Sequence, residues 1–503
     1  MLLALQKSIT GIGFINWYWG GWWVLVSSLM KGDRMKQEFK LLIDGVLVTG
    51  ASDMPVLNPS TGLVFAQAPR ANVGQLNESV AAAKKAFPAW AARSISERRN
   101  MLLMLADQVE VNVELLACLL TCEQGKPLAQ ARMESMACVQ IIQGMSDNEL
   151  SPKVLRDDGG SLITEVRTPL GVVAAITPWN FPLALLMNKL APALLAGNTV
   201  VVKPAPTTPL TTLFVGELCS RVFPAGVVNV ITDANDLGSL LVEHPDVTKV
   251  AFTGSTATGR KVMQTAASAI KRITLELGGN DAALVLSDAD VKSVAQKVFD
   301  GAMLNAGQIC VAIKRVYVPN ELHDAFCDEL SVLVKNMIVG DGHDFGTQLG
   351  PVQNRTQYEK LKDLLEECAR DGRVISGAVH PSENGYFIPP SIVCDLDDSS
   401  RIVREEQFGP ILPVLRYADL DEVIRRINDS EFGLAATVWG TDLVHATKVA
   451  ERIDAGTVWV NKHLDLSPGI PFRGAKQSGF GAELGRAGFE EYTQAKVINV
   501  LLD

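Results

Sequence analysis

The stretch GVVAAITPWN at positions 171–180 is an apolar run that ends in the polar sequence Thr-Pro-Trp-Asn. Three similar runs follow it, TVVVK at 199–203, VVNVIT at 227–232 and KVAFTG at 249–254. Each run predicts a strand, and the segments between the runs predict helices. This alternation indicates βαβ units, so we expect an α/β fold built on a Rossmann-type parallel sheet.

The chain on either side of this sheet predicts further helices and strands. Before it, residues 73–92 and 96–123 predict amphipathic helices, and the helical pattern continues to about residue 144. After residue 310, strands and helices alternate again, which predicts a second αβ domain with its own sheet. The sequence has no low-complexity linker, so we expect the domains to pack together and to share a cleft.

Two segments predict strands that have no neighbour in the sequence. Residues 151–166 read as a hairpin around the DDGG turn at 157–160, and AKVINVLL at 495–502 predicts a single strand. An isolated hairpin is only marginally stable in water and needs a packing partner. We interpret the segments as an arm that adds strands across a subunit boundary, although pairing within the chain fits the pattern equally well.

The composition argues against several classes of function. The 503 residues are 47% apolar, carry a net charge of -10 and contain no Lys/Arg-rich run, which disfavours a nucleic-acid partner. The eight cysteines form no CxxC pair, which is typical of a reducing compartment, so we expect a cytoplasmic protein. The six histidines lie far apart and form no HExxH motif, so we predict no metal site.

Residues 1–34 form an unusual apolar extension. Positions 8–30 carry no charge and include four tryptophans. A run of this length can span a bilayer, but glycines and clustered tryptophans suit a membrane interface better than a hydrocarbon core. Because MKQEFKLLIDGVLV at 35–48 reads as an ordinary domain start, our first interpretation is that translation begins at Met35. A membrane segment at 8–30 is the alternative.

The segment LELGGN at 275–280 contains a carboxylate, Glu276, and the segment NAGQIC at 305–310, further along the chain, ends in a thiol, Cys310. A thiolate can attack a carbonyl carbon, and a nearby carboxylate can activate a water molecule. The residues before Cys310 have little bulk, so its sulfur and backbone N–H can face a substrate. Equally, Cys310 can be one of eight cysteines that fill cores, which is the usual place of a free cysteine.

The turn at 254–259 joins a predicted strand to a predicted helix and resembles a phosphate-binding loop. The next pair is Arg260-Lys261, so the pattern GxxxxGK[ST] is not satisfied, which argues against a kinase or an ATPase. Backbone N–H groups at such a helix start can still bind a pyrophosphate, or the turn can serve only as a helix cap.

Six motifs occur in a specific order: TPWNFP at 177–182, GNTVVVKPA at 197–205, FTGST at 252–256, LELGGN at 275–280, GQIC at 307–310 and EEQFGP at 405–410. From about residue 36 to its end, the chain resembles the aldehyde dehydrogenase superfamily of hydrolytic, NAD(P)-dependent enzymes. The resemblance implies a homodimer or homotetramer and three structural parts. These are an NAD(P)-binding domain at 35–150 and 168–276, a catalytic domain at 277–472, and a β oligomerisation arm at 151–167 and 485–503.

The resemblance also implies a mechanism. Cys310 matches the nucleophile that forms a thiohemiacetal with the aldehyde and, after hydride transfer to NAD or NADP, a thioester. The Asn180 side-chain amide and the Cys310 backbone N–H match the donors to the oxyanion, which are often worth about 3 kcal/mol each. Glu276 matches the base that activates water to release the carboxylic acid.

The positions that match cofactor contacts in the family are Trp179, Lys203, Gly254, Ser255, Glu406 and Phe408. Lys203 matches a contact to the adenine-side ribose, and Glu406 a contact to the hydroxyls of the nicotinamide ribose. Many members that prefer NAD have a glutamate three residues after this lysine, where this chain has Pro206. The resemblance therefore admits NADP as well as NAD.

Substrate identity is weakly marked. Leu185, Ile309 and Val311 match tunnel-lining positions and are apolar, which favours an aliphatic or aromatic aldehyde, although such residues are also ordinary core. Asn188 replaces an aromatic residue of some relatives, which weakens the case for a cage around a trimethylammonium group. Arg473 replaces a glycine in the PFGG motif, and we expect it to lie in solvent.

Three alternatives remain open at the level of sequence. An acyl-transferring dehydrogenase and a thiol esterase would use the same acyl intermediate on Cys310, although Glu276 disfavours transfer to coenzyme A. A non-catalytic scaffold tethered to a membrane through residues 8–30 would need neither Cys310 nor Asn180. Lys189 matches a lysine near the active site of relatives, and we assign it no role.

Overall fold

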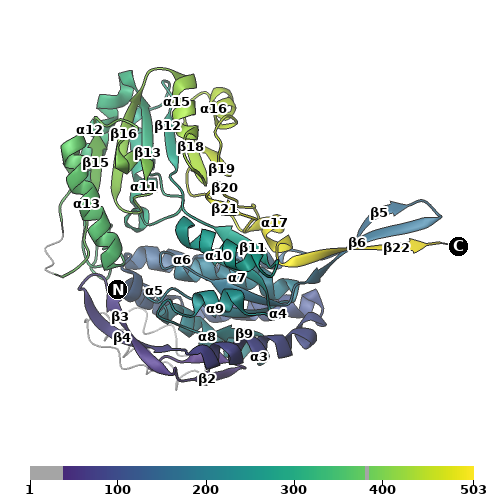
Figure 1. Ribbon diagram of the computed structural model, residues 1–503. Helices are drawn as coiled ribbons and strands as arrows, with labels where there is room; N and C mark the ends of the chain where they lie inside the picture. Colours follow the sequence, from purple (N-terminus) through teal and green to yellow (C-terminus); the bar gives the residue numbers. More distant parts are fainter. Residues whose placement is uncertain (1–37, 380–383, 503) are drawn as a thin grey trace, which may run out of the picture.

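The computed structural model describes residues 38–379 and 384–502, so the apolar extension at 1–34 lies outside the described residues. Within this part of the chain, two large sheets with helices around them form the body, and a smaller sheet projects from it (Figure 1). The predicted α/β fold with parallel-strand sheets is confirmed. Among the described helices, none is long and apolar enough to cross a membrane.

The first sheet has the strand order β2-β1-β9-β8-β7-β10-β11-β21. Its strands are β1 (Leu41–Ile43), β2 (Val46–Val48), β7 (Val172–Ile176), β8 (Thr199–Lys203), β9 (Val228–Val230), β10 (Val247–Thr253), β11 (Arg272–Glu276) and β21 (Gly479–Phe480). The five strands β9, β8, β7, β10 and β11 run parallel to one another, whereas β1 and β21 pair antiparallel with β9 and β11 at the two sides. Every residue of β7 and β8 is buried, which explains why these strands are continuous apolar runs rather than alternating ones.

The order of these strands creates a switch point. The chain runs from β7 outward to β8 and β9, and then crosses to β10 and β11 on the other side of β7. In open sheets of this type, ligands bind outside the carboxyl ends of the strands where the direction of winding reverses. The polar residues that follow the apolar runs of β7, β8 and β10 in the sequence therefore lie along one edge of the sheet.

The helices of this half are α3 (Val73–Ala91), α4 (Ile95–Val111), α5 (Val113–Gln124), α6 (Leu128–Ser146), α7 (Pro182–Ala196), α8 (Leu210–Val222), α9 (Gly238–Glu243) and α10 (Thr256–Ala267). The prediction of continuous helix from 96 to about 144 is wrong, because this segment forms three helices. Asn112 separates α4 from α5, and Gly125, with a positive φ of 96°, ends α5. Glycine adopts this left-handed conformation without a steric penalty.

The second sheet confirms the predicted second αβ unit, with the order β14-β15-β16-β13-β12-β18-β19. Its strands are β12 (Ala282–Val285), β13 (Arg315–Pro319), β14 (Arg373–Ser376), β15 (Ser391–Cys394), β16 (Ile411–Tyr417), β18 (Ala435–Trp439) and β19 (Thr457–Val460). The accompanying helices are α11 (Val291–Met303), α12 (Asn320–Asn336), α13 (Arg355–Asp371), α14 (Arg401–Arg404), α15 (Leu420–Asn428) and α16 (Leu443–Ala450). Only the edge pair β14–β15 of this described sheet is antiparallel.

Short strands late in the chain connect the two halves. β21 pairs antiparallel with β11, so that Gly479 lies opposite Glu276. β20 (Ala475–Lys476) pairs with β17 (Phe432–Gly433). A separate hairpin of β3 (Ser52–Asn58) and β4 (Leu63–Arg70) lies near the start of the described chain. The end of the first sheet that carries Glu276 is thus completed by residues from beyond the second sheet.

The projecting sheet consists of β5 (Lys153–Asp157), β6 (Ser161–Pro169) and β22 (Thr493–Leu501), in the order β22-β6-β5. The predicted hairpin and the predicted C-terminal strand are both confirmed. β22 pairs antiparallel with β6 from Thr493–Pro169 to Leu501–Ser161, so the pairing within the chain is the one observed. Figure 1 shows this sheet extending away from the body. The short helix α17 (Gly485–Glu490), just before β22, packs against α7 in the body.

Candidate active site

The loop that carries Cys310 has an unusual backbone. It leaves α11 through the 3-10 turn η1 (Leu304–Gly307), in which Asn305, Ala306 and Gly307 have positive φ values of 52°, 54° and 69°. Such conformations are unfavourable for residues with side chains, and they are concentrated at functional sites. A Cβ at Gly307 would lie 2.3 Å from the carbonyl oxygen of Gly409, so only glycine fits there.

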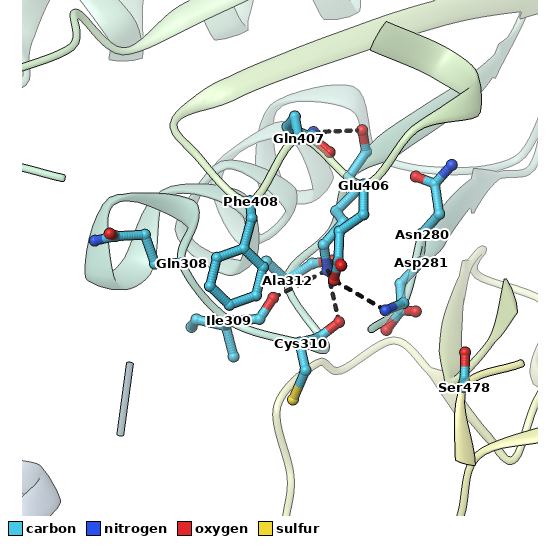
Figure 2. Close-up of polar contacts among 12 residues, drawn as sticks. Asn280, Asp281, Gln308, Ile309, Cys310, Ala312, Glu406, Gln407, Phe408 and Ser478 are labelled. Carbon is cyan, nitrogen blue, oxygen red and sulfur yellow. Dashed lines mark hydrogen bonds and ion pairs between the residues drawn. The ribbon is translucent and has the colours of Figure 1, made fainter. Parts of the chain in front are cut away.

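Lys314 fixes the backbone of this loop. Its Nζ donates hydrogen bonds to the carbonyl oxygens of Ile309 at 2.9 Å, Cys310 at 2.6 Å and Ala312 at 3.3 Å. Cys310 is a partly exposed residue, and its sulfur points away from Glu406 (Figure 2). Burial by the surrounding protein raises the pKa of Cys310 to about 12, and the charge of Lys314 opposes this rise. The described side chains therefore favour the protonated thiol.

Asn180 lies beside the same loop. Its Nδ2 donates to the carbonyl oxygen of Gln308 at 3.0 Å. Asn305 donates to this carbonyl at 3.3 Å and to the carbonyl of Asn180 at 3.1 Å, so it joins the two segments. An asparagine amide has two N–H groups, and the bond to Gln308 uses one of them. The structure thus brings Asn180 next to the loop of Cys310 with one donor left for a ligand.

A buried ion pair that the sequence analysis missed supports Asn180. Lys126 Nζ donates to the carbonyl oxygen of Asn180 at 2.9 Å and to Glu134 at 2.5 Å, and both charged side chains are fully buried. Glu134 also accepts hydrogen bonds from the backbone N–H groups of Leu183 and Ala184 at the start of α7. In the sequence, the only indication that Glu134 is buried was its helical spacing with the apolar residues of α6.

Glu276 lies at the end of β11 and is buried. Within the described residues, neither of its carboxyl oxygens has a hydrogen-bond partner. Burial raises its pKa well above the ordinary value, the charge of Glu483 adds to this rise, and Lys189 opposes it. Its charge adds to the rise in the pKa of Cys310. Gly279, three residues after Glu276, lies against the loop of Cys310, since a Cβ at Gly279 would be 2.8 Å from the Cys310 carbonyl oxygen. An unpartnered carboxyl group with a raised pKa beside a thiol is a candidate general base.

Lys189, to which the sequence gave no role, forms a buried ion pair with Glu483. Its Nζ also donates to the Thr253 hydroxyl at 2.5 Å, at the end of β10. Both charges act on Glu276, as its pKa shift shows. The sequence analysis missed Glu483 because the segment that carries it reaches Glu276 only through the tertiary pairing of β21 with β11.

Four of the predicted cofactor residues, Trp179, Lys203, Gly254 and Ser255, end or follow strands of the first sheet, whereas Glu406 and Phe408 precede β16 of the second sheet. Trp179 follows β7, and its ring meets the ring of Phe408 edge to face, with centroids 5.4 Å apart. Ser255 follows Gly254 after β10 and caps α10, because its hydroxyl accepts a hydrogen bond from the Thr258 N–H at 3.2 Å. The helix-cap interpretation of this turn is therefore correct for Ser255.

Lys203 and Glu406 both have protein partners. Lys203 is the last residue of β8, and its Nζ donates to Asp233 at 2.7 Å and to the Pro204 carbonyl oxygen at 3.3 Å. Glu406 accepts a hydrogen bond from the Gly279 N–H at 2.9 Å and lies 3.9 Å from Lys314 Nζ. Burial raises the pKa of Glu406. Through Lys314, the position of Glu406 is tied to the loop of Cys310.

The family model that describes the aldehyde dehydrogenase family matches residues 47–498. The chain belongs to the aldehyde dehydrogenase family. A mitochondrial aldehyde dehydrogenase of Leishmania tarentolae is 38% identical to it, over 92% of this chain and 94% of that protein.

Solved structures agree with this assignment. An aldehyde dehydrogenase from Brucella melitensis biovar abortus 2308 is 35% identical with a TM-score of 0.89, over 93% of this chain and 98% of that one. A betaine aldehyde dehydrogenase from Staphylococcus aureus in complex with NAD+ is 32% identical with a TM-score of 0.90, over 95% and 98%. The enzyme is therefore an NAD(P)-dependent aldehyde dehydrogenase, as the resemblance implied.

Cys310 of this aldehyde dehydrogenase borders an apolar cluster. Cys310 packs against a buried group that includes Ile309, Leu434, Trp459 and Phe472, together with the partly buried Phe181 and Leu464. Of the predicted tunnel residues, Ile309 and Val311 belong to this cluster, and Leu185 is partly exposed. The Asn188 amide donates to Glu483 at 3.4 Å, and Arg473 is exposed, as expected.

Proposed function

We propose that this enzyme oxidises an aliphatic or aromatic aldehyde to its carboxylic acid through a thioester on Cys310. The observation that carries the proposal is the convergence of three groups: the loop of Cys310, the amide of Asn180 and the unpartnered carboxyl group of Glu276. The apolar cluster beside Cys310 supports the substrate class, because apolar surface gains about 25 cal/mol per Å² on burial and an unpaired charge would be penalised.

In the first step, Cys310 Sγ bonds to the aldehyde carbon as the thiol proton leaves. The Asn180 N–H that is not bonded to Gln308 and the backbone N–H of Cys310 donate to the resulting oxyanion. Lys126 and Asn305 hold the backbone of Asn180 before the substrate arrives, so this donor needs no reorganisation. Preorganised donors of this kind contribute about 3 kcal/mol each.

In the last step, Glu276 takes a proton from the water molecule that attacks the thioester. The carboxylic acid leaves, and Cys310 returns to its starting form. Because burial raises its pKa, the Glu276 carboxylate is a stronger base than an exposed glutamate. The neighbouring pair of Lys189 and Glu483 sets the charge around it.

The residues at the switch point between β7 and β10 fit a dinucleotide. Those that would hold NAD or NADP are Trp179, Lys203, Gly254, Ser255, Glu406 and Phe408. Gly254 and Ser255 start α10, where backbone N–H groups favour a pyrophosphate. When bound, the coenzyme would supply the two-electron oxidation of the substrate carbon, as the acceptor of a hydride. Pro206, three residues after Lys203, carries no carboxylate to repel a 2'-phosphate. This supports binding of NADP as well as NAD.

The test is reduction of NAD and of NADP with a panel of aliphatic, aromatic and charged aldehydes, comparing the wild-type enzyme with Cys310→Ala. We expect turnover that depends on Cys310 and is highest with uncharged aldehydes. Product analysis with and without coenzyme A distinguishes release of the free acid from acyl transfer. Folded wild-type protein that oxidises no aldehyde with either coenzyme, or Cys310→Ala protein that retains full turnover, would contradict the proposal.

We further propose that the projecting sheet joins subunits in a homodimer or homotetramer. Its apolar side chains are exposed in the single chain, including Val154 at 57%, Val497 at 58% and Leu501 at 80%. Exposed apolar groups on an unpaired sheet favour association. Val497→Asp should lower the molecular mass measured by light scattering, whereas Ile270→Asp, at an exposed apolar residue of the body, should leave it unchanged. An unchanged mass in Val497→Asp would contradict the proposal that the projecting sheet joins subunits.

We also propose that the enzyme is located in the cytoplasm. All eight cysteines lie within the described residues and are free thiols, as expected in a reducing compartment. Fractionation of cells into soluble and membrane pools tests this location. Recovery of the enzyme with membranes would instead support residues 8–30 as a membrane segment.

A further inference from the structure

Two buried thiols meet in the second half of the molecule, away from the loop of Cys310. Cys327 lies on α12 and Cys394 ends β15, and their Sγ atoms are 3.1 Å apart. The two residues are 1% and 0% exposed and belong to one apolar cluster, whereas Cys310 borders another. Because α12 packs against β15, no movement of either element is needed to bring the sulfur atoms into contact.

A few polar groups lie beside this thiol pair within its apolar cluster. His323 lies one turn before Cys327 on α12, and its ring nitrogens are 3.7 and 3.8 Å from the Cys327 sulfur. Arg373 stands opposite Cys394 in the pairing of β14 with β15 and forms an exposed ion pair with Asp395. β14 is the edge strand of its sheet, so Cys394 on β15 lies one strand from the edge, opposite the exposed Arg373.

These neighbours make the two thiols unequal. The hydrogen bond with Cys327 lowers the pKa of Cys394, and the charges of Arg373 and Arg416 act in the same direction, against the effect of burial. The same hydrogen bond and burial raise the pKa of Cys327. Because Arg373 stands opposite Cys394 in the pairing of β14 with β15, we assign the thiolate to Cys394, and the thiolate is the form that reacts with oxidants.

We propose that Cys327 and Cys394 are a site of reversible oxidation, at which a peroxide forms an intrachain disulfide between them. The Cys394 thiolate attacks a peroxide oxygen and becomes a sulfenic acid, while the displaced hydroxide takes a proton and leaves as water. The Cys327 sulfur then attacks the Cys394 sulfur, and its proton leaves through His323 with the sulfenic oxygen as a second water. In sum, two thiols and one hydrogen peroxide give one disulfide and two water molecules.

The bond would link α12 covalently to β15. Crosslinking these distant points of the chain restricts the unfolded state, so the oxidised enzyme should be more stable than the reduced one. Reduction by a dithiol reverses the change. Because Cys310 takes no part, the modification is chemically separate from catalysis.

Peptide mapping of the full-length enzyme tests the site directly. The protein is treated with hydrogen peroxide, unfolded, alkylated and digested with trypsin without a reductant. The tryptic peptides 316–335 and 374–401 contain one cysteine each, so a linked peptide identifies the bond. We expect this peptide after peroxide and its loss after dithiothreitol. Recovery of both peptides in alkylated form, at a peroxide dose that oxidises Cys310, would overturn the proposal.

Thermal unfolding provides an independent measurement. Cys219→Ala is the matched control for Cys327→Ala, because Cys219 is also buried and only burial raises its pKa. In the wild type and the control, the peroxide-treated protein should melt roughly 2 °C or more above the same protein after dithiothreitol. Cys327→Ala should lack this difference. An equal difference in Cys327→Ala would show that the stabilisation has another source.

Discussion

Asn180→Ala removes one of the two donors proposed for the oxyanion, and the structure sets the size of the effect. The amide has two N–H groups, and one donates to the Gln308 carbonyl at 3.0 Å, so a single donor is lost from the oxyanion. Loss of one preorganised donor costs about 3–4 kcal/mol, so kcat should fall about 10²- to 10³-fold. The KM for the aldehyde should change much less, because the charge develops only after binding.

The matched control is Asn305→Gly, because Asn180→Ala also removes a hydrogen bond from the Gln308 carbonyl. Asn305 donates to the same carbonyl at 3.3 Å and to the Asn180 carbonyl at 3.1 Å, and its φ of 52° suits glycine. Neutral hydrogen bonds contribute about 1 kcal/mol each, so this variant should lose no more than about thirtyfold in kcat.

Stopped-flow measurement of reduced coenzyme gives the first turnover and the steady state of both variants, with circular dichroism as the check on folding. The expected order is a small loss in Asn305→Gly and a large loss in Asn180→Ala. Folded Asn180→Ala enzyme within about threefold of the wild type would refute the assignment of the donor, since one hydrogen bond alone would explain so small a change. An equal loss in Asn305→Gly would refute it as well.

Three further predictions concern other parts of the site. Glu276→Gln should retain a first-turnover burst of reduced coenzyme, because only the hydrolysis step loses its base. The steady-state rate of this variant should fall about 10²- to 10⁴-fold. Loss of the burst would contradict this role of Glu276. Since the pKa of Glu276 is raised, the wild-type steady-state rate should increase as pH rises through that raised value, and Glu276→Gln should flatten the profile. Pro206→Glu should lower kcat/KM with NADP more than with NAD. An unchanged ratio of the two kcat/KM values would argue against contact between residue 206 and the 2'-position of the coenzyme. Glu134→Gln leaves Lys126 charged and unpaired in the interior, at a cost of about 3–5 kcal/mol. Its melting temperature should fall, and the double variant Lys126→Met/Glu134→Gln should recover part of the loss.

The sequence predicted those parts of the fold whose signal is local. The strands β7, β8 and β10 are apolar runs bounded by turn residues, and the DDGG turn marks its hairpin without reference to the rest of the chain. The partner of the 495–502 strand stayed open, because alternation along one strand does not identify its neighbour. β21 was missed for a related reason, since a strand of two residues exists only through its pairing with β11.

The same distinction applies to the candidate site. Cys310, Glu276 and Asn180 lie in motifs with a specific order, so the sequence alone is enough to propose them as catalytic residues. Lys126 and Glu134 lie in no such motif, and their importance comes from complete burial around the backbone of Asn180. A charged residue reads the same in a sequence whether it faces solvent or a buried partner, although the two cases differ by several kcal/mol.

The proton of Cys310 connects the two catalytic steps. Burial raises the pKa of the thiol to about 12, and the charge of Glu276 is among those that add to this rise. Lys314 opposes it only through its charge, because its Nζ is occupied by three carbonyl oxygens. A protonated Glu276 carries no charge that disfavours the thiolate, so Cys310 loses its proton more easily while Glu276 is neutral. We infer that the thiolate forms while Glu276 is protonated, and that Glu276 must lose its own proton before it can activate water for hydrolysis.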